Sequence, residues 1–151
     1  MNVVYRNTWT TLAPWGPFVL RVIVGLGLFA HGYQKMFELT GEGVPRMVGF
    51  TQMVGGFGFP GPPEFWAWAA ALTELVGGAL LVVGLLTRVV AVLAIILLLV
   101  ATIQVKWPQG WIGGYELDLL YIGALVSLFL TGPGALSMDE AIRQRRGGRW
   151  I

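Results

Sequence analysis

The chain has 151 residues, of which 56% are hydrophobic and only 12% are charged, and its formal net charge is +2. Soluble domains average about a quarter charged residues, so this composition disfavours a water-soluble fold and indicates one small domain whose main partner is the lipid bilayer and not a nucleic acid. The sequence has no cysteine and one histidine, which excludes disulfides, thiolate chemistry and iron–sulfur ligation by this chain and predicts no metal site.

Four apolar runs follow one another along the chain, at residues 15–37, 65–86, 89–105 and 115–131. The first two have ample length for a bilayer core about 30 Å thick, and the last two are near the short limit of roughly 17 residues. Backbone groups in lipid must be satisfied within their own segment, so the runs are predicted as helices. The predicted fold class is all-α, an integral membrane four-helix bundle over residues 15–131. Only Thr87 and Arg88 separate the second and third spans, which predicts a tight antiparallel hairpin.

The one long connection, residues 38–64, is predicted to carry a short surface helix between the first and second spans. Its middle, Pro45–Val54, places Met47, Phe50 and Val54 on one side of such a helix. The cluster Pro60–Pro63 then interrupts the chain before the second span. We interpret this segment as a cap over the mouth of the bundle, and a mobile loop is the alternative.

Aromatic and basic residues predict how the spans sit in the membrane. All seven tryptophans fall near span ends or outside the spans, as interfacial aromatic belts require. With four spans, the N-terminal segment 1–14 and the basic tail 132–151 share a side. That side carries more basic residues than the other (Arg6, Arg88, Arg143, Arg145, Arg146 and Arg149 against Lys35, Arg46 and Lys106). The positive-inside rule therefore predicts a multi-pass plasma-membrane protein with both termini in the cytoplasm.

Glu74 lies near the centre of the second span, where an ionisable residue costs roughly 2.5–3.5 kcal/mol on insertion scales. It shares one helix face with small residues (Ala67, Ala70, Ala71, Gly77 and Gly78), which allow close helix approach. Glu74 is therefore predicted to face a neighbouring helix. Arg21 lies about 9 Å in from the cytoplasmic side and Glu74 about 15 Å in from the outer side, so the two are predicted to form a structural ion pair.

A polar vestibule is predicted near the outer mouth of the bundle. His31 shares its depth there with Tyr115, Glu116 and Asp118. Histidine is the side chain that most readily gains and loses a proton near neutral pH, so His31 is the strongest functional candidate, although a structural donor role is the alternative. Lys35 and Lys106 are expected to snorkel to the interface. Asp118 is expected to cap or hydrate the start of the last helix.

The ordered series of motifs resembles the DoxX family of small membrane proteins over residues Val19 to Asp139. The series consists of Arg21 and then four segments and a tail motif: Phe29–Lys35, Glu74–Gly78, Gly84–Arg88, Gly114–Leu117 and Gly132–Asp139. The resemblance implies a four-helix membrane protein linked to oxidoreductase systems. Relatives include the small subunit of an archaeal thiosulfate:quinone oxidoreductase and proteins that associate with a superoxide dismutase and a sulfurtransferase in an actinobacterial membrane complex.

Two functions remain open at this point. The first is a quinone-interacting subunit of an oxidoreductase, without a covalently bound cofactor of its own. Its candidate donors are His31, Lys35 and Tyr115, and its candidate proton carriers are Glu74, Glu116 and Asp118. The alternative is a non-catalytic anchor or assembly subunit that docks protein partners or forms a homo-oligomer. A proton or transport path along Glu74 and His31 is a weaker third idea, because four short spans without inverted repeats disfavour alternating access.

Overall fold

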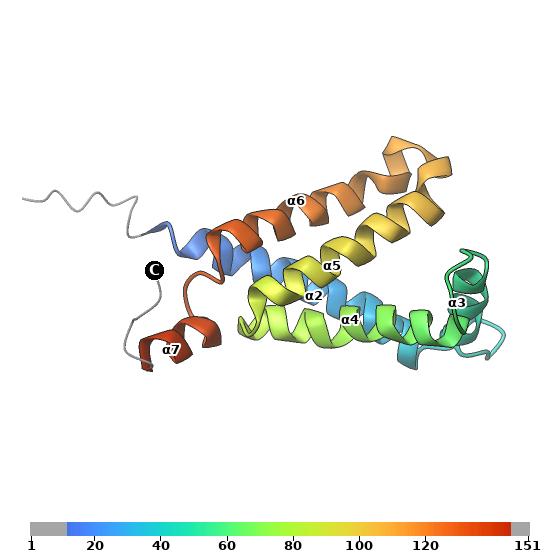
Figure 1. The fold of residues 1–151 in the computed structure, drawn as a ribbon, viewed down its shortest axis with the longest axis horizontal. Coiled ribbons are helices and arrows are strands. Elements are labelled where there is room, and N and C mark those ends of the chain that lie inside the picture. The colour runs from blue at the N-terminus through green and yellow to red at the C-terminus, as the bar shows by residue number, and fades with distance from the viewer. Residues whose placement is uncertain (1–11, 146–151) are drawn as a thin grey trace, which may run out of the picture.

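The computed structural model describes residues 12–145, and its long helices are arranged as a four-span bundle (Figure 1). The main helices are α2 (Trp15–Phe37), α4 (Pro63–Val83), α5 (Thr87–Ala101) and α6 (Glu116–Thr131). Helix α5 continues through η1 (Thr102–Lys106) and η2 (Trp107–Gln109), and the irregular turn η3 (Trp111–Tyr115) leads into α6. Four helical stretches in this part of the chain are long and apolar enough to cross a membrane. The predicted fold class is confirmed. Most of the N-terminal segment 1–14, with Trp9, lies outside the described residues, as do Arg146, Arg149 and Trp150.

The short helix predicted between the first two spans is present as α3 (Arg46–Gly55). Met47 and Val54 are buried on its inner side and pack with Ala67 and Ala71 of α4. Helix α3 lies at the end of the bundle opposite to the two described ends of the chain (Figure 1). It packs against α2 and α4 at that end, and the interpretation of the whole segment as a cap over the mouth of the bundle stays a prediction.

Helices α2 and α4 pack closely because glycines face one another along their contact. A Cβ atom on Gly32 would lie 2.4 Å from the backbone nitrogen of Leu75, and one on Gly78 would lie 2.4 Å from the backbone nitrogen of Phe29. The small-residue face of α4 is buried here, with Glu74 among its buried residues. The prediction that Glu74 faces a neighbouring helix is confirmed.

Arg21 is completely buried, and all its hydrogen bonds within the described residues go to backbone carbonyls. Its guanidinium donates to Leu81 and Val82 in the last turn of α4. It also donates to three carbonyls after α6, those of Pro133, Ala135 and Leu136, at 2.6–3.0 Å. The last carbonyls of a helix have no partner within the helix and carry partial negative charge, so a cation is stabilised there. Arg21 thus joins the start of α2, the end of α4 and the segment after α6.

The predicted ion pair between Arg21 and Glu74 is therefore wrong, and Glu74 pairs with Lys35 instead. The glycine contacts fix the register of the two helices: Gly32 lies beside Leu75, while Gly25 lies beside Gly78 and Val82. Arg21 is eleven residues before Gly32, about 16 Å along the helix axis. Depths estimated from the ends of the predicted spans were too coarse to detect this offset.

The turn between α4 and α5 is held by the segment after α6. Gly84 and Leu86 have left-handed backbone conformations, with φ of 71° and 53°. The carboxylate of Asp139 accepts hydrogen bonds from the backbone nitrogens of Leu86 and Thr87 at 2.8 and 2.9 Å and so caps α5. Asp139 lies in the first turn of the short helix α7 (Met138–Arg145), where hydrogen bonds from Arg143 and Gln144 lower the pKa of Glu140. We call the contacts of Arg21 and Asp139 the closed end of the bundle.

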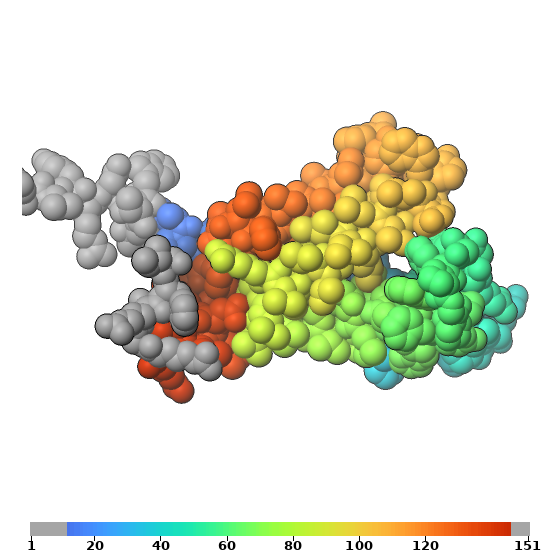
Figure 2. Space-filling view, in the orientation of Figure 1, coloured from blue at the N-terminus to red at the C-terminus, as the bar shows by residue number. Residues whose placement is uncertain are grey.

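Away from the closed end the bundle opens. Helices α4 and α5 meet at their connecting turn, and the α5–α6 pair then diverges from the α2–α4 pair toward α3 (Figure 1). The main apolar core, which includes Val24, Leu81, Val90 and Leu125, joins all four helices. The space-filling view shows a hollow between α3 and the last turns of α5 (Figure 2).

The glycine contact between α2 and α4 predicts that one added methyl group lowers stability at this contact and not elsewhere. Replacing Gly78 by alanine places a Cβ atom 2.4 Å from the backbone of Phe29, so the helices must separate, at a cost of about 1–3 kcal/mol. The matched control is Gly123→Ala in α6, where a Cβ atom meets nothing within 4 Å and helix propensity improves. The midpoint temperature of thermal unfolding in detergent is expected to fall only for Gly78→Ala. Equal midpoints for both variants would contradict the close packing.

The carbonyl contacts of Arg21 predict that it stabilises the closed end. Arg21→Met leaves buried carbonyls without donors, and hydrogen bonds to charged groups are worth about 1.5–3 kcal/mol each. We expect a loss of at least about 3 kcal/mol, which Arg21→Lys recovers in part because one ammonium cannot reach all five carbonyls. Arg88→Met, at an exposed arginine near the same end, serves as the control. Unfolding midpoints that do not distinguish Arg21→Met from Arg88→Met would refute this role.

Candidate functional site

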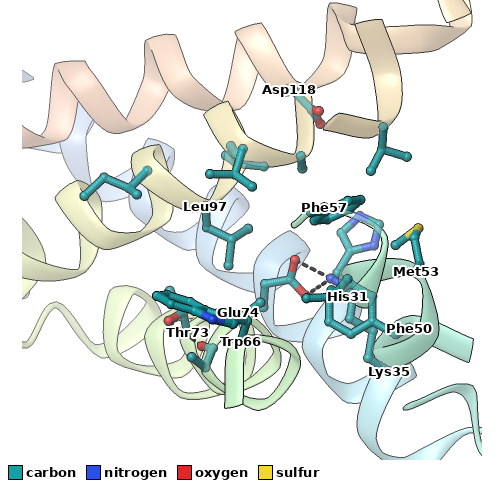
Figure 3. A pocket seen from close by; sticks show the side chains of 18 of the residues that line it. His31, Lys35, Phe50, Met53, Phe57, Trp66, Thr73, Glu74, Leu97 and Asp118 are labelled. Carbon is teal, nitrogen blue, oxygen red and sulfur yellow. Dashed lines mark hydrogen bonds and ion pairs between the residues drawn. The ribbon is translucent and has the colours of Figure 1, made fainter. Parts of the chain in front are cut away.

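A cavity of about 660 Å³ lies between the α2–α4 pair and the α5–α6 pair, beneath α3 (Figures 2 and 3). Most of its lining is apolar and comes from α3, the segment after it, α4 and α5. The charged and imidazole side chains in the lining are His31, Lys35, Glu74, Lys106 and Asp118. Small-molecule sites are commonly apolar cavities of about 300–1,000 Å³ with a few placed polar groups. The cavity has this character.

Lys35 and Glu74 form an ion pair on one wall of the cavity (Figure 3). The Lys35 ammonium donates to both carboxylate oxygens of Glu74, with Nζ–Oε1 at 2.6 Å. The Glu74 side chain is only 7% exposed and that of Lys35 is 25% exposed. Nζ also lies 4.5 Å from the ring centroid of Phe50 in α3, a cation–π contact. The expectation that Lys35 simply snorkels to the interface is wrong, because it balances the charge of Glu74 and connects α2, α3 and α4.

A second ion pair, between Lys106 and Asp118, lies on the opposite wall. The Nζ–Oδ1 distance is 2.6 Å, and the other carboxylate oxygen accepts from the Thr102 hydroxyl at 3.1 Å. Asp118 is 5% exposed, so its charge is well removed from solvent. Asp118 was expected to cap or hydrate the start of α6, and this is wrong because its carboxylate binds Lys106 and Thr102. The snorkelling of Lys106 stays a prediction.

His31, which belongs to α2, points into the same cavity (Figure 3). Met53 of α3 and Phe57, which follows α3, point into it as well. His31 lies one helical turn before Lys35, so both side chains fall on the cavity side of α2. Within residues 12–145 its imidazole makes no hydrogen bond, and its side chain remains exposed to the cavity. A ligand in the cavity would therefore meet an imidazole that can donate or accept.

Tyr115 and Glu116, the remaining candidates of the predicted vestibule, do not line the cavity. Tyr115 stacks on Trp107, with ring centroids 5.2 Å apart, and meets Trp111 edge-on. Glu116 is two residues from Asp118 on α6, and residues two apart on a helix do not share a face. The predicted layer combined residues of equal depth that point in different directions.

The sequence interpretation missed Lys106 and Thr102 as members of the site. The sequence did offer a signal, since Lys106 and Asp118 stand on either side of the turn that joins two predicted spans. Aromatic side chains from outside the spans, Phe57 and Phe59, were also missed as cavity lining. Their positions depend on the path of the segment between α3 and α4, which its prolines and glycines do not specify residue by residue.

The two ion pairs define what the cavity can do chemically. Each pair is neutral as a unit, so four charges are held in a mainly apolar space without net charge. Ion pairs that face a region of low dielectric interact strongly with polar atoms of a bound molecule. Within residues 12–145, no group of three or more His, Asp and Glu side chains could hold a metal ion. The site therefore presents ammonium and imidazole donors to a ligand that carries acceptor oxygens.

Comparison with known proteins agrees with this architecture. The DoxX family model matches residues 16–107. A Bacillus subtilis (strain 168) protein named "Putative oxidoreductase CatD" is 37% identical over 127 residues, which cover 84% of this chain and 87% of that protein. An uncharacterized membrane protein of Mycobacterium tuberculosis is 31% identical over 141 residues (83% and 80%), and an uncharacterized Haemophilus influenzae protein is 34% identical over 129 residues (80% and 85%). No solved structure matches the chain. With its family model matched from the first span into the third and relatives aligned over most of its length, the chain belongs to the DoxX family.

Proposed function

We propose that the chain is a membrane subunit of an oxidoreductase system and that its cavity binds the headgroup of a lipid-soluble quinone. The observation that carries the proposal is a mainly apolar cavity among four membrane spans that is lined by two lysine–carboxylate pairs and a histidine. The name of the B. subtilis relative supports an association with oxidoreductases.

The position of the cavity favours a ligand that arrives through lipid. Helices α4 and α5 diverge from their shared turn, so the space between them widens along the membrane spans (Figure 1). Leu93 and Ile96 of α5 line the cavity and are about half exposed. An apolar molecule in the bilayer thus reaches the cavity without crossing water. A quinone with an isoprenoid chain fits this route, because its chain can remain among the lipids while its ring enters.

The polar groups of the cavity suit the oxygens of a quinone. Each carbonyl oxygen of a quinone accepts hydrogen bonds, and Lys35 and His31 supply donors on one wall. The flat ring can pack against the aromatic side chains of Phe50, Phe57 and Trp66. Orientation by two or three polar contacts within an apolar slot is typical of small-molecule recognition.

The redox step requires a partner. Reduction of a quinone to a quinol takes up two electrons and two protons. The chain has no cysteine and one histidine, so the part left to its residues is proton transfer. His31 is placed to supply a proton, and Glu74, a carboxylate bound to Lys35, is placed to relay one. The two electrons come from a redox-active partner subunit. The role proposed for this chain is thus to bind the quinone and to handle its protons.

The arrangement in the membrane is part of the same proposal. Arg88, Arg143 and Arg145 lie at the closed end, while Lys35 and Lys106 lie toward the open end. By the positive-inside rule the closed end faces the cytoplasm of a plasma membrane, together with both termini. The cavity then lies in the outer half of the bundle.

The alternative of a purely structural anchor has less support. The sequence feature that supported an anchor was the small-residue face of the second span, which could dock a partner or a second copy of the chain. That face is buried against α2 of the same chain. A transport path along Glu74 and His31 is also disfavoured, because the cavity lining reaches no further toward the closed end than Leu28 on α2.

Filling the cavity is expected to weaken quinone binding. Leu97→Trp introduces bulk at a lining position of α5, whereas Leu99→Trp places the same side chain at an exposed position outside the lining. Calorimetric titration of the chain in lipid nanodiscs with a short-chain quinone is expected to show at least a tenfold weaker affinity for Leu97→Trp only. Equal affinities in the two variants would place any bound quinone elsewhere.

Single and double substitutions of Lys35 and Glu74 are expected to distinguish the role of this ion pair in quinone binding from its role in folding. Lys35→Met alone leaves a buried unpaired carboxylate and is expected to cost about 3–5 kcal/mol of stability. The double variant Lys35→Met/Glu74→Met replaces the pair by apolar side chains of similar volume, so stability returns. Quinone affinity is expected to stay at least tenfold reduced, because the ammonium donor is absent. A stable double variant that binds quinone as well as the original chain would show that the pair serves packing alone.

A further inference from the structure

We infer that Lys106, held by Asp118 and Thr102, forms a second oxygen-binding subsite on the wall opposite Lys35. This subsite would bind the far carbonyl of a para-quinone, so that the ring is held at both ends. The inference rests on the proposed function, since it specifies how the quinone is recognised in the same cavity. Nothing in the family match or in the names of the relatives assigns a role to Lys106.

The first support is the local backbone around Lys106. Residues Thr102–Lys106 form a π-helical turn, and the backbone nitrogen of Trp107 donates to the carbonyl of Thr102, five residues earlier. Turns of this kind are rare and occur frequently at functional sites. Thr102 and Lys106, four residues apart on this turn, both bind the same carboxylate of α6.

The second support is the number of donors that Lys106 keeps. Asp118 accepts from Thr102 with one oxygen and from Lys106 with the other, so its acceptors are directed to these two groups. An ammonium has three donors, and Lys106 makes one hydrogen bond within residues 12–145. Its side chain is 33% exposed and lines the cavity. Two N–H groups thus remain for a ligand, on a cation whose position is fixed.

The pairing of the two walls indicates which class of quinone fits. Lys35 and Glu74 lie on one side of the cavity and Asp118 lies across it (Figure 3). A ligand with one polar end, such as a lipid with a single carbonyl, would leave one ammonium facing apolar atoms, which costs free energy. A para-quinone carries an acceptor oxygen at each end of its ring. The opposed lysines match this arrangement, and a ligand with adjacent oxygens does not match it.

The test compares menadione with a ketone of the same carbon skeleton that lacks the second carbonyl and the double bond of the quinone ring. Menadione, a para-naphthoquinone, has two opposed carbonyls, and 2-methyl-1-tetralone keeps only one of them. The chain in nanodiscs is expected to bind menadione at least tenfold more tightly than the tetralone. In Lys106→Met this ratio is expected to fall to about one, with the affinity for the tetralone unchanged, because Lys35 still holds its single oxygen. Thr102→Val, which frees one oxygen of Asp118, is expected to reduce the ratio severalfold.

Controls keep the test decisive. If Lys106→Met does not fold because Asp118 is left unpaired, the variant Lys106→Met/Asp118→Leu removes both charges and carries the same expectation. A similar loss of affinity for both ligands would mean that Lys106 only maintains the structure, which overturns the inference. Equal affinities of the two ligands for the original chain would also overturn it while leaving the proposed function intact. Failure of both ligands to bind the original chain would instead refute the proposed function and the inference together.

Discussion

The buried guanidinium of Arg21 is the interaction on which the rest of the structure depends. A charge inside a membrane bundle is tolerated only where protein groups replace the lost water. The terminal carbonyls of α4 and those of the segment after α6 do this through five hydrogen bonds. Since these carbonyls belong to segments far apart in the sequence, their common donor holds three parts of the chain at one place. Asp139 completes the arrangement by capping α5.

Fixing the helices at one end has a direct consequence for the other end. The glycine contacts hold α2 against α4 along much of their length, while α5 and α6 are free to diverge beyond the shared core. The resulting space would be unstable if it were lined by isolated charges. Instead, each carboxylate in it has an ammonium partner from another segment. The motifs that suggested the family fall into two groups: Gly84–Arg88 and Gly132–Asp139 build the closed end, and His31, Lys35 and Glu74 line the cavity.

Much of the fold followed from simple patterns in the sequence. Long apolar runs located the spans, the small-residue face of the second span showed which side of Glu74 is buried, and the pattern around Phe50 indicated α3. Pairwise contacts were harder to predict. Arg21 binds carbonyls, which every residue possesses and which leave no trace in the sequence, so the search for an acidic partner led to Glu74. Lys106 binds Asp118 across the turn between the last two spans, and hydrophobic periodicity does not reveal which polar side chains of neighbouring spans meet.

The one-sided opening of the bundle also determines from which monolayer a guest can come. At the closed end the core residues Val24, Leu81 and Leu125 keep the helices in contact. The void begins only at the level of Leu28 and continues toward α3. An amphiphile that binds there as proposed would exchange with one monolayer only, the one at the level of α3. Molecules in the other monolayer would first have to flip across the bilayer, so lipid asymmetry would control how quickly the site fills.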